Sequence, residues 1–411
     1  MSEETKKAPA IRFQGFTDDW EQRKLGDTFE FSVSTNSLSR AQLNYEKGNI
    51  KSIHYGDILI KYNSILEITK DKIPFITDGS IEKYKPNLLE NGDVVFADAA
   101  EDETVGKAVE INGISDEYVV AGLHTIVARP KEKMAKYFSG YYINADVYQR
   151  QLLRLMQGTK VSSISKGNLK KTIVAYPKNL AEQQKIGSFF KQLDNAIALH
   201  QRQLDNYKQL KKSMKQKIFD QKLRFKDADG NDYPKWKRRT LGEISEIIMG
   251  QSPDSANYTS NEQDTVLIQG NADLNGGRIT PRIYTTQITK TCEAGDIILT
   301  VRAPVGDLAI ANTRACIGRG VCAIKGDLYI YQYLEMIRDT DGWRKIIQGS
   351  TFESINSNDV KDLPIDVPSS EERKKIAEFF KALDRRIEKS TQRVESMKQF
   401  RKGLMQQMFV E

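Results

Sequence analysis

An internal duplication constrains the fold of this chain more than any other feature of its sequence. Residues 182–219 align without a gap to residues 372–409, a shift of 190 positions, and 14 of the 38 aligned residues are identical. The shared residues include the pattern E..KI..FFK.LD..I. Because chance does not produce a match of this length, we predict two copies of one structural unit.

The repeat extends beyond these two segments. The matching stretches are Arg12-Phe13 with Arg224-Phe225, WEQRKLG at 20–26 with WKRRTLG at 236–242, and NGDVV at 91–95 with AGDII at 294–298. The turns at Gln157-Gly158 and Gln348-Gly349 also match. One unit therefore covers residues 12–223 and the other residues 224–411. We expect each to be a globular block followed by a long helix.

Apolar residues in both duplicated segments follow the alternating four-three spacing of a coiled-coil seam. They are Ile186, Phe190, Leu193, Ile197, Leu204, Tyr207, Met214 and Ile218, and Ile376, Phe380, Leu383, Ile387, Val394, Met397, Leu404 and Met408. The spacing predicts two long helices. Polar residues interrupt the seam at matching places, His200 with Ser390 and Lys211 with Arg401. We interpret them as fixing the pairing register and not as binding a ligand.

The two helices are expected to pair with each other. A compact domain returns its chain to about the place where it entered, so the second helix should run antiparallel to the first. A helix of 38 residues is about 57 Å long, which predicts blocks at opposite ends of a rod. The duplication then implies a pseudo-twofold arrangement. It also implies a circular organisation in which Phe409 lies close to Arg12.

Inside the blocks, short strands alternate with one helix each. The predicted strands are 58–60, 94–96, 118–120 and 125–128 in the first block and 266–268, 297–299 and 321–324 in the second. One helix is expected at about 136–156 and another at 328–347. The predicted fold class is therefore α+β, with two similar globular domains separated by two long antiparallel helices that form a coiled coil.

Composition excludes several classes of protein. Hydrophobic residues make up 39% of the 411 residues, yet no apolar run approaches the roughly 18 residues of a membrane span, and the chain starts with polar residues. A cytoplasmic protein without a membrane partner is expected. The three cysteines, Cys292, Cys316 and Cys322, form no Cys-x-x-Cys pair. Reduced, buried thiols are predicted in place of disulfides or a zinc site.

Positive charge is concentrated in the two helices. The chain carries a net charge of +7. Residues 182–221 hold eight Lys/Arg against four Asp/Glu, and residues 371–411 hold eleven against seven, so the two segments sum to +8. The rest of the chain is about neutral. Solvated faces of long helices are charge-rich in any case; a polyanion that runs past the helices is the other interpretation.

The sequence offers no convincing catalytic machinery. An adenine amino methyltransferase needs an Asn/Asp-Pro-Pro-aromatic loop for the flipped base and a glycine-rich turn for S-adenosylmethionine, and the sequence contains neither. Asp359-Val360-Lys361 resembles part of a nuclease motif, but no acidic partner precedes it at a suitable spacing. We interpret it as a solvated turn. A non-catalytic chain without a cofactor or metal of its own is predicted.

Several motifs together carry a resemblance to a known family. They are the run PKNLAEQQKIGSFFKQLD at 177–194 with its repeat at 368–384, GQSP at 250–253, AGLHTIVARP at 121–130, and the QGT and QGS turns. Over essentially its whole length the chain resembles the specificity (S) subunit of type I restriction-modification systems. The resemblance implies two target recognition domains, each of which reads one half of a split double-stranded DNA sequence, held apart by two conserved helices.

The resemblance also implies partners and domain limits. Two methyltransferase (M) subunits would dock on the helices and restriction (R) subunits would join them. S-adenosylmethionine would then belong to the methyltransferase, and ATP and Mg²⁺ to the restriction subunit. The expected domains are a disordered N-terminus (1–11), target recognition domain 1 (12–178), the central conserved helix (179–223), target recognition domain 2 (224–368) and the C-terminal conserved helix (369–411).

Base recognition calls for Arg or Lys at guanine and Asn or Gln at adenine, presented by loops. The DNA-binding candidates are Lys61, Asn63, Lys107, His124, Thr159 and Lys160 in the first block, and Gln251, Asn271, Arg302, Arg319, Ser350 and Thr351 in the second. Partner contacts are expected near the helix starts, at Gln183, Lys185, Phe189 and Lys191, and at Arg373, Lys375, Phe379 and Lys381. Two alternatives stay open: a stand-alone DNA-binding scaffold, and a protein-only adaptor whose helices dock partners.

Overall fold

The computed structural model describes residues 8–102, 104–158, 162–347 and 353–410. The chain forms two compact units. The first comprises the residues up to His200 together with those from Arg393 onward, and the second comprises Gln201–Gln392. Residues 1–7 of the predicted disordered N-terminus lie outside the described residues. The end of that segment is held in the first unit, because the Ile11 amide donates to the Gln407 carbonyl at 2.9 Å.

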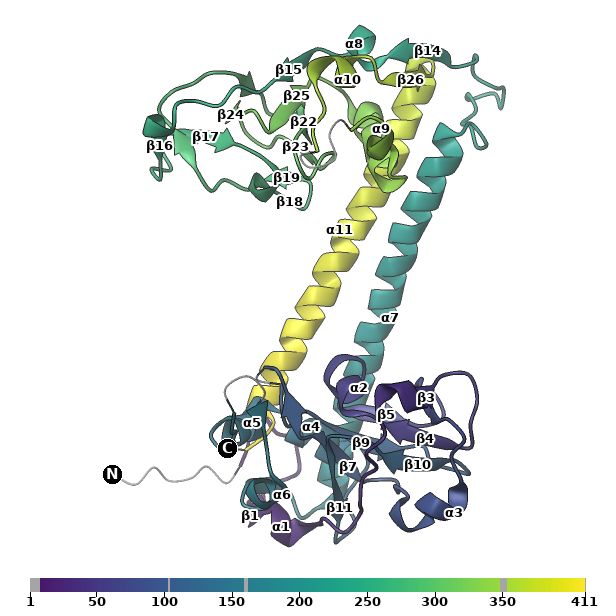
Figure 1. Cartoon of the computed structure of the whole chain (residues 1–411), viewed down its shortest axis with the longest axis vertical. Helices are drawn as coiled ribbons and strands as arrows, with labels where there is room; N and C mark the ends of the chain where they lie inside the picture. Colours follow the sequence, from purple (N-terminus) through teal and green to yellow (C-terminus); the bar gives the residue numbers. More distant parts are fainter. Residues whose placement is uncertain (1–7, 103, 159–161, 348–352, 411) are drawn as a thin grey trace. The chain divides into compact units, whose positions relative to one another are not determined.

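The two predicted long helices are confirmed as α7 (Leu180–Phe219) and α11 (Ser370–Gln407), and each contributes to both units (Figure 1). Within the first unit the ring of Phe190 stacks on Phe409, with centroids 5.5 Å apart. Arg401 Nε donates to the Asp194 carboxylate at 2.5 Å. As the residue number rises along α7 from Phe190 to Asp194, that of the contact falls from Phe409, just past the end of α11, to Arg401. The helix segments in this unit are therefore antiparallel.

The second unit repeats these contacts at positions shifted by 190 residues. The ring of Phe380 stacks on Phe219, with centroids 6.4 Å apart. Lys211 Nζ lies 2.8 Å from the Asp384 carboxylate. Lys211 and Arg401, two of the polar residues that interrupt the seam, thus form matching ion pairs with an aspartate on the other helix. A role of these two residues in fixing the pairing register stays a prediction, and the ion pairs support it.

In the first unit, short strands form two main sheets and two strand pairs. The sheet orders are β10-β4-β6-β3 and β2-β11-β7-β9-β5, and the pairs are β1-β13 and β12-β8. The strands are β1 (Glu21–Lys24), β2 (Phe29–Glu30), β3 (Leu43–Asn44), β4 (Ile50–Ile53), β5 (Ile65–Glu67), β6 (Phe75–Ile76), β7 (Val94–Ala97), β8 (Ala99–Ala100), β9 (Ala108–Asn112), β10 (Tyr118–Ala121), β11 (Thr125–Pro130), β12 (Ser162–Ser163) and β13 (Ile173–Tyr176). The helices are α1 (Leu25–Thr28), α2 (Tyr55–Ile60), α3 (Ile81–Tyr84), α4 (Phe138–Ile143), α5 (Asp146–Leu153) and α6 (Lys166–Leu169).

The second unit has sheet orders β15-β25-β22-β23-β19-β18 and β16-β20-β17-β24-β21, and the pair β14-β26. Its strands are β14 (Lys237–Thr240), β15 (Ile247–Met249), β16 (Tyr258–Thr259), β17 (Thr265–Ile268), β18 (Leu274–Asn275), β19 (Arg278–Ile279), β20 (Tyr284–Thr285), β21 (Thr291–Cys292), β22 (Ile297–Thr300), β23 (Leu308–Ile310), β24 (Ala315–Ile317), β25 (Val321–Ile324) and β26 (Pro364–Val367). Its helices are α8 (Leu241–Ile244), α9 (Leu328–Asp339) and α10 (Ser357–Lys361). The predicted α+β class with two similar domains is confirmed.

One predicted strand is wrong. Residues 58–60 belong to α2, and the true counterpart of β17 is β4, because β4 pairs in parallel with β10 as β17 does with β24. The imidazole of His54 caps α2 by accepting from the Gly56 amide at 3.2 Å. Asp57 in the first turn is buried and bonded to Arg40. Local capping and this distant partner favour the helix over a strand.

Both predicted helices within the blocks are shorter than expected. The segment 136–156 forms α4 and α5, separated at Asn144, whose side-chain amide donates to the carbonyls of Gly140 and Ala108. The segment 328–347 forms α9, which ends before Asp341, a residue with a left-handed backbone (φ 57°). A short 3₁₀ turn, Gly342–Lys345, follows.

In each unit the segment that begins the repeat is bound to the start of a long helix, α7 or α11, by an equivalent Arg–Glu ion pair. Arg12 Nε donates to the buried Glu182 carboxylate at 2.7 Å, and the Trp20 indole donates to the same group at 3.3 Å. In the second unit the equivalent residues are Arg224, Trp236 and Glu372, with a shortest Arg–Glu distance of 2.6 Å. The sequence repeat at 12–13 and 20–26 thus marks a structural joint.

The C-terminal end of α11 lies beside the N-terminal segment within the first unit, where Ile11, next to Arg12, donates its amide to the Gln407 carbonyl. Met405, Met408, Phe409 and Val410 are buried in the core of that unit. The ring centroids of Phe409 and Trp20 are 6.4 Å apart. The end of the chain therefore completes the domain at its beginning, as a circular organisation requires.

All three cysteines are free and buried, as predicted. Burial raises the pKa of Cys292 to about 11 and that of Cys322 to about 12. These thiols act as small apolar core residues.

Candidate nucleic-acid interface

Four loops of the second unit are joined by backbone hydrogen bonds at the ends of β17, β22 and β24 (Figure 1). The Gly318 amide donates to the Ile268 carbonyl at 2.7 Å, and the Gln251 amide to Ile317 at 2.8 Å. The Val301 amide donates to the Gly320 carbonyl at 2.9 Å. We call this region, residues 250–252, 268–271, 301–302 and 317–320, the junction of the second unit.

Glycines allow these loops to approach closely. A Cβ atom on Gly320 would lie 1.9 Å from the Gln269 carbonyl oxygen, and one on Gly250 would lie 2.1 Å from that of Gly318. Neither position accepts a larger residue without a shift of the backbone. The glycines of the GQSP and IGRG turns therefore hold the backbone of the junction together.

The junction collects four of the predicted DNA-binding residues. Gln251, Asn271, Arg302 and Arg319 all belong to it, and all four are exposed. Within the described chain none of their side chains forms a hydrogen bond or an ion pair, whereas backbone amides are bonded: that of Gln251 to Ile317, and that of Arg319 to the Ser252 hydroxyl at 3.1 Å. Exposed side chains on a fixed backbone suit base recognition, because little backbone order is lost on binding.

The first unit has the same arrangement of backbone bonds. The Gly122 amide donates to the Ile53 carbonyl at 2.8 Å, and the Asn36 amide to Ala121 at 3.0 Å. The Asp98 amide donates to the His124 carbonyl at 3.1 Å. We call residues 36, 53–55, 98–99 and 121–124 the junction of the first unit.

Each unit has a fourth equivalent backbone hydrogen bond, and the four bonds together show which residues of the two junctions correspond. The Ile164 amide donates to Asp98, as the Ile355 amide donates to Val301. The equivalent pairs, first unit before second, are Asn36 with Gln251, Ala99 with Arg302, Leu123 with Arg319 and His124 with Gly320. No pair is identical. The two junctions thus share a backbone and differ in their side chains.

His124 is the predicted residue that lies in the first junction itself. Its ring packs edge-on against Tyr55, with centroids 5.2 Å apart, and its Nδ1 lies 3.3 Å from the Asp98 carboxylate. Burial raises the pKa of Asp98. The His124 side chain is half exposed and its backbone is left-handed (φ 53°). Strain of this kind in a residue other than glycine accompanies functional positions.

Lys61, Asn63 and Lys107 gather around the C-terminal end of α2. Lys107 Nζ donates to the Leu59 carbonyl at 3.0 Å, and burial lowers the pKa of Lys107. Lys61 Nζ donates to the Tyr45 hydroxyl at 2.7 Å and lies 2.9 Å from Asp57. Asn63 is exposed. The predicted residues are thus near one another, although the helix that gathers them was not predicted.

Four further residues of this region, Arg40, Tyr45, Asp57 and Lys72, were missed by the sequence analysis. Arg40 forms a bidentate ion pair with Asp57, at 2.8 and 2.5 Å. Tyr45 lies under the ammonium groups of Lys61 and Lys72, which are 4.8 and 5.2 Å from its ring centroid. The interleaved Lys-Tyr-Arg composition is a weak signal, because Arg40 and Asp57 are 17 positions apart and no sequence pattern links them.

Four candidates, Thr159, Lys160, Ser350 and Thr351, lie outside the described residues. Their assignment to DNA stays a prediction.

Seven of the eight predicted partner-binding residues contact their own unit. Gln183 is buried; it accepts from the Ala135 amide at 2.9 Å and donates to the Pro177 carbonyl at 2.8 Å. Its equivalent Arg373 forms a bidentate pair with Asp327, at 2.6 and 2.9 Å. Phe189 packs on Phe13, and its equivalent Phe379 packs on Phe225 in the same way. The ammonium group of Lys185 lies over the Phe16 ring, and that of Lys375 lies over the Tyr233 ring. Lys191 lies 3.5 Å from Glu67, and Lys381 is exposed. These contacts leave the partner-binding prediction untested.

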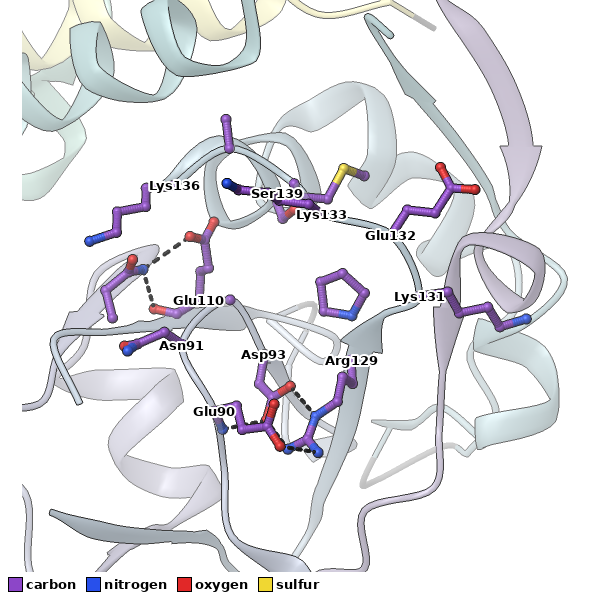
Figure 2. A pocket seen from close by; sticks show the side chains of 15 residues that line it. Glu90, Asn91, Asp93, Glu110, Arg129, Lys131, Glu132, Lys133, Lys136 and Ser139 are labelled. Carbon is purple, nitrogen blue, oxygen red and sulfur yellow. Dashed lines mark hydrogen bonds and ion pairs between the residues drawn. The ribbon is translucent and has the colours of Figure 1, made fainter. Parts of the chain in front are cut away.

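Figure 2 shows a separate pocket of about 360 Å³ in the first unit. Arg129 pairs there with Asp93 at 2.8 Å and with Glu90 at 2.7 Å. The buried Glu110 carboxylate accepts from the amides of Tyr137 and Gly140, at 2.7 and 2.8 Å, and burial raises its pKa. The carboxylates of Asp93 and Glu110 are thus engaged in structural bonds.

A search of the described residues finds no group of three or more His, Cys, Asp or Glu side chains placed to hold a metal ion. Among those residues, no helix is both long and apolar enough to cross a membrane.

Comparison with known proteins gives consistent matches. The family model of the type I restriction modification DNA specificity domain matches residues 17–209 and 233–398. A type I restriction enzyme specificity subunit of Methanocaldococcus jannaschii, MjaX, is 29% identical over 403 residues, which cover 94% of this chain and 92% of that protein. A second subunit from the same organism, MjaIX, is 26% identical over 202 residues, 46% of this chain and 47% of that protein.

Two solved structures share the fold. The S subunit of a type I restriction-modification system from M. genitalium aligns with a TM-score of 0.60 at 15% identity, covering 98% of this chain and 99% of that one. A chain from a structural study of type I R-M complex assembly and conformational transition aligns with a TM-score of 0.59 at 20% identity, covering 95% and 97%.

Proposed function

Since the chain belongs to the type I restriction modification DNA specificity family, we propose that it is the sequence-recognition subunit of a type I restriction-modification complex and that its two junctions read the unlike halves of a split DNA target. The observation that carries this proposal is the shared backbone of the two junctions with different residues in the four equivalent pairs Asn36–Gln251, Ala99–Arg302, Leu123–Arg319 and His124–Gly320. Identical readers would favour a palindrome, whereas unlike readers favour two different half-sites.

The chemistry of the second junction supports base recognition. Arginine donates two hydrogen bonds to guanine, and asparagine or glutamine pairs with adenine in the same bidentate manner. Arg302, Arg319, Gln251 and Asn271 supply both kinds of donor from exposed positions. In the first junction the places of Arg302, Arg319 and Gln251 are taken by Ala99, Leu123 and Asn36. We therefore assign a different base sequence to each unit.

The chain is further proposed to be non-catalytic and to act through partners. Two methyltransferase subunits would dock on α7 and α11, and restriction subunits would join that complex. S-adenosylmethionine would then be bound by the methyltransferase, and ATP and Mg²⁺ by the restriction subunit. The repeated helix segments support two equivalent docking positions, because each surface on one copy has a counterpart on the other.

Co-expression with a type I methyltransferase subunit from the same source tests the assembly. We expect the two proteins to purify together with two methyltransferases per chain, measured by native mass spectrometry, and we expect the complex but not the isolated chain to methylate DNA. Sequence-specific binding without an associated methyltransferase would support a stand-alone DNA scaffold. Partner capture without any DNA binding would support a protein adaptor.

A further inference from the structure

Ile60, at the C-terminal end of α2, is exposed, and the contacts of α2 fix its orientation. Its exposed fraction is 84%, the largest for a large apolar residue in the part of the chain that the structure describes; Leu199 follows with 62%. Single exposed apolar residues are common on protein surfaces, so exposure alone carries no conclusion. The way in which this side chain is held, and its surroundings, give it meaning.

Three contacts fix α2 so that Ile60 faces outward. Ile58 is fully buried, and a residue two positions further along a helix points to nearly the opposite side. Asp57, with no exposed surface, is bonded to Arg40 and to Lys61. Lys107 Nζ holds the Leu59 carbonyl at the end of the helix. Ile60 therefore cannot turn inward unless these bonds break.

The surroundings of Ile60 are cationic. Arg40, Lys61 and Lys72 cluster around Tyr45, and the Asp57 carboxylate pairs with two of these cations, Arg40 and Lys61. The Arg40 and Lys61 side chains are 44% and 50% exposed, so both are open to a polyanion. A protein-docking surface is more often depleted of lysine at its centre. The charge around Ile60 favours the phosphate backbone of DNA.

The helix also starts at the first junction. His54, which caps α2, directly follows β4, and Tyr55 of α2 contacts His124. In the second unit Asn271 begins the short 3₁₀ helix, Asn271–Asp273, that follows β17. Ile60 is thus displayed on an element of the proposed reading surface.

We propose that Ile60 is a specificity-determining residue that contacts the 5-methyl group of a thymine in the major groove, while Arg40 and Lys61 bind the neighbouring phosphates. Apolar contact with this methyl group distinguishes thymine from the other bases in that groove. The inference rests on the proposed function and adds the base that the first unit recognises and the residue that does so.

Deoxyuridine provides the test, because it differs from thymidine only by the missing methyl group. The complex of this chain with its methyltransferase is bound to duplexes that carry its mapped target, with each thymine in both halves replaced in turn, and the Kd is measured by fluorescence anisotropy. We expect one position, in one half only, to weaken wild-type binding about 4-fold, the effect of one lost methyl contact. Ile60→Ala should weaken binding to the thymine duplex and abolish the difference at that position.

Leu153→Ala, which truncates an exposed leucine of α5, is the matched control and should change neither value. Ile60→Val, a smaller truncation, is used if the alanine variant does not assemble. The inference is wrong if no thymine is sensitive, if both half-sites contain only G·C pairs, or if the Ile60 variant keeps the wild-type ratio between thymine and deoxyuridine. If Ile60→Ala weakens binding to the thymine and the deoxyuridine duplex equally, Ile60 contacts DNA without recognising the methyl group. A complex that binds no split sequence would instead refute the proposed function.

Discussion

At the scale of single residues, Arg302 and Arg319 are the strongest candidates for base contact in the second unit. Both project from loops whose backbones are bonded to neighbouring strands or loops, through the Val301 and Gly318 amides. Both are exposed, and in the described chain neither guanidinium has an ion-pair partner. A substitution at either position therefore removes no structural contact that the described residues show.

Charge reversal at these arginines should change recognition without changing assembly. We expect Arg302→Glu or Arg319→Glu to slow methylation of the native target. The loss in free energy of recognition should be about 1 to 3 kcal/mol, because a bidentate base contact is lost and a repulsive charge is added. Base changes in one half-site should then matter less than in the wild type, while the other half-site is unaffected. Methylation rates on duplexes altered in each half check this.

Arg314→Glu is the matched control, since Arg314 is an exposed arginine of the same unit that pairs with Glu293 outside the junction. It should leave half-site preference intact. If the Arg302 and Arg319 variants no longer bind the methyltransferase, these residues are structural and the assignment fails.

At the scale of elements, a buried ion cluster holds α9 to α7 within the second unit. Lys215, which is buried, lies 2.8 Å from both Glu335 and Asp339, and Lys211 also pairs with Glu335. Burial alone would raise the pKa of Glu335, but the charges of Lys211 and Lys215 outweigh it and lower the pKa below its ordinary value of 4.5. The folded state therefore favours the ionised carboxylate.

This lowered pKa predicts an acid-sensitive α9. A depressed carboxylate pKa contributes stability above the unfolded-state value, and that contribution is lost as the pH falls from about 4.5 through the folded-state value. Hydrogen exchange of α9 amides, corrected for intrinsic rates, should show less protection at pH 4 than at pH 7. Glu335→Gln should lose about 1 to 3 kcal/mol at neutral pH and respond less to acid. Equal acid responses in wild type and variant would show that the cluster does not stabilise α9.

The elements also show what sequence reasoning reaches and where it stops. The dipeptide Gly-Asp followed by aliphatic residues starts a strand at 92–95 and at 295–298, yet at 56–59 it lies in α2. The difference comes from the His54 cap and from the bond between Asp57 and Arg40. A contact between residues 17 positions apart leaves no periodic pattern in the sequence. The sequence therefore could not show that residues 58–60 form a helix and not a strand.

The long helices were predictable because their seam repeats over many turns. The junction was only partly predictable: the GQSP and IGRG turns indicate loops, but the amide bonds that join them connect residues about 66 positions apart. Gln251, Arg302 and Arg319 were therefore found as separate candidates, while Arg40 and Ile60 were missed.

At the scale of the whole molecule, the two ends of the chain belong to one domain. Phe409 contacts Trp20, Phe138 and Phe190 in the core of the first unit. Its equivalent in the duplication, Phe219, contacts Tyr329 and Phe380 in the second. A substitution at Phe409 should therefore destabilise the domain that contains the N-terminal segment.

Phe409→Ala should cost about 3 to 5 kcal/mol, the usual effect of emptying a buried aromatic site. Hydrogen exchange should then rise in β7, β11 and α4 of the first unit while β22 and β25 of the second keep their protection. Phe400→Ala, in the same helix but 58% exposed, should change stability by less than about 0.5 kcal/mol. Loss of protection confined to the second unit would contradict the circular organisation.

The most direct test of the central claim is the pattern of DNA methylation that this chain directs. A host that lacks other methyltransferases would express the chain with its methyltransferase, and its genome would be read by single-molecule sequencing with an empty-vector strain as the control. The account predicts one motif made of two different defined sequences separated by a stretch of unspecified bases. A contiguous motif, a palindromic motif, or methylation that does not depend on this chain would contradict it.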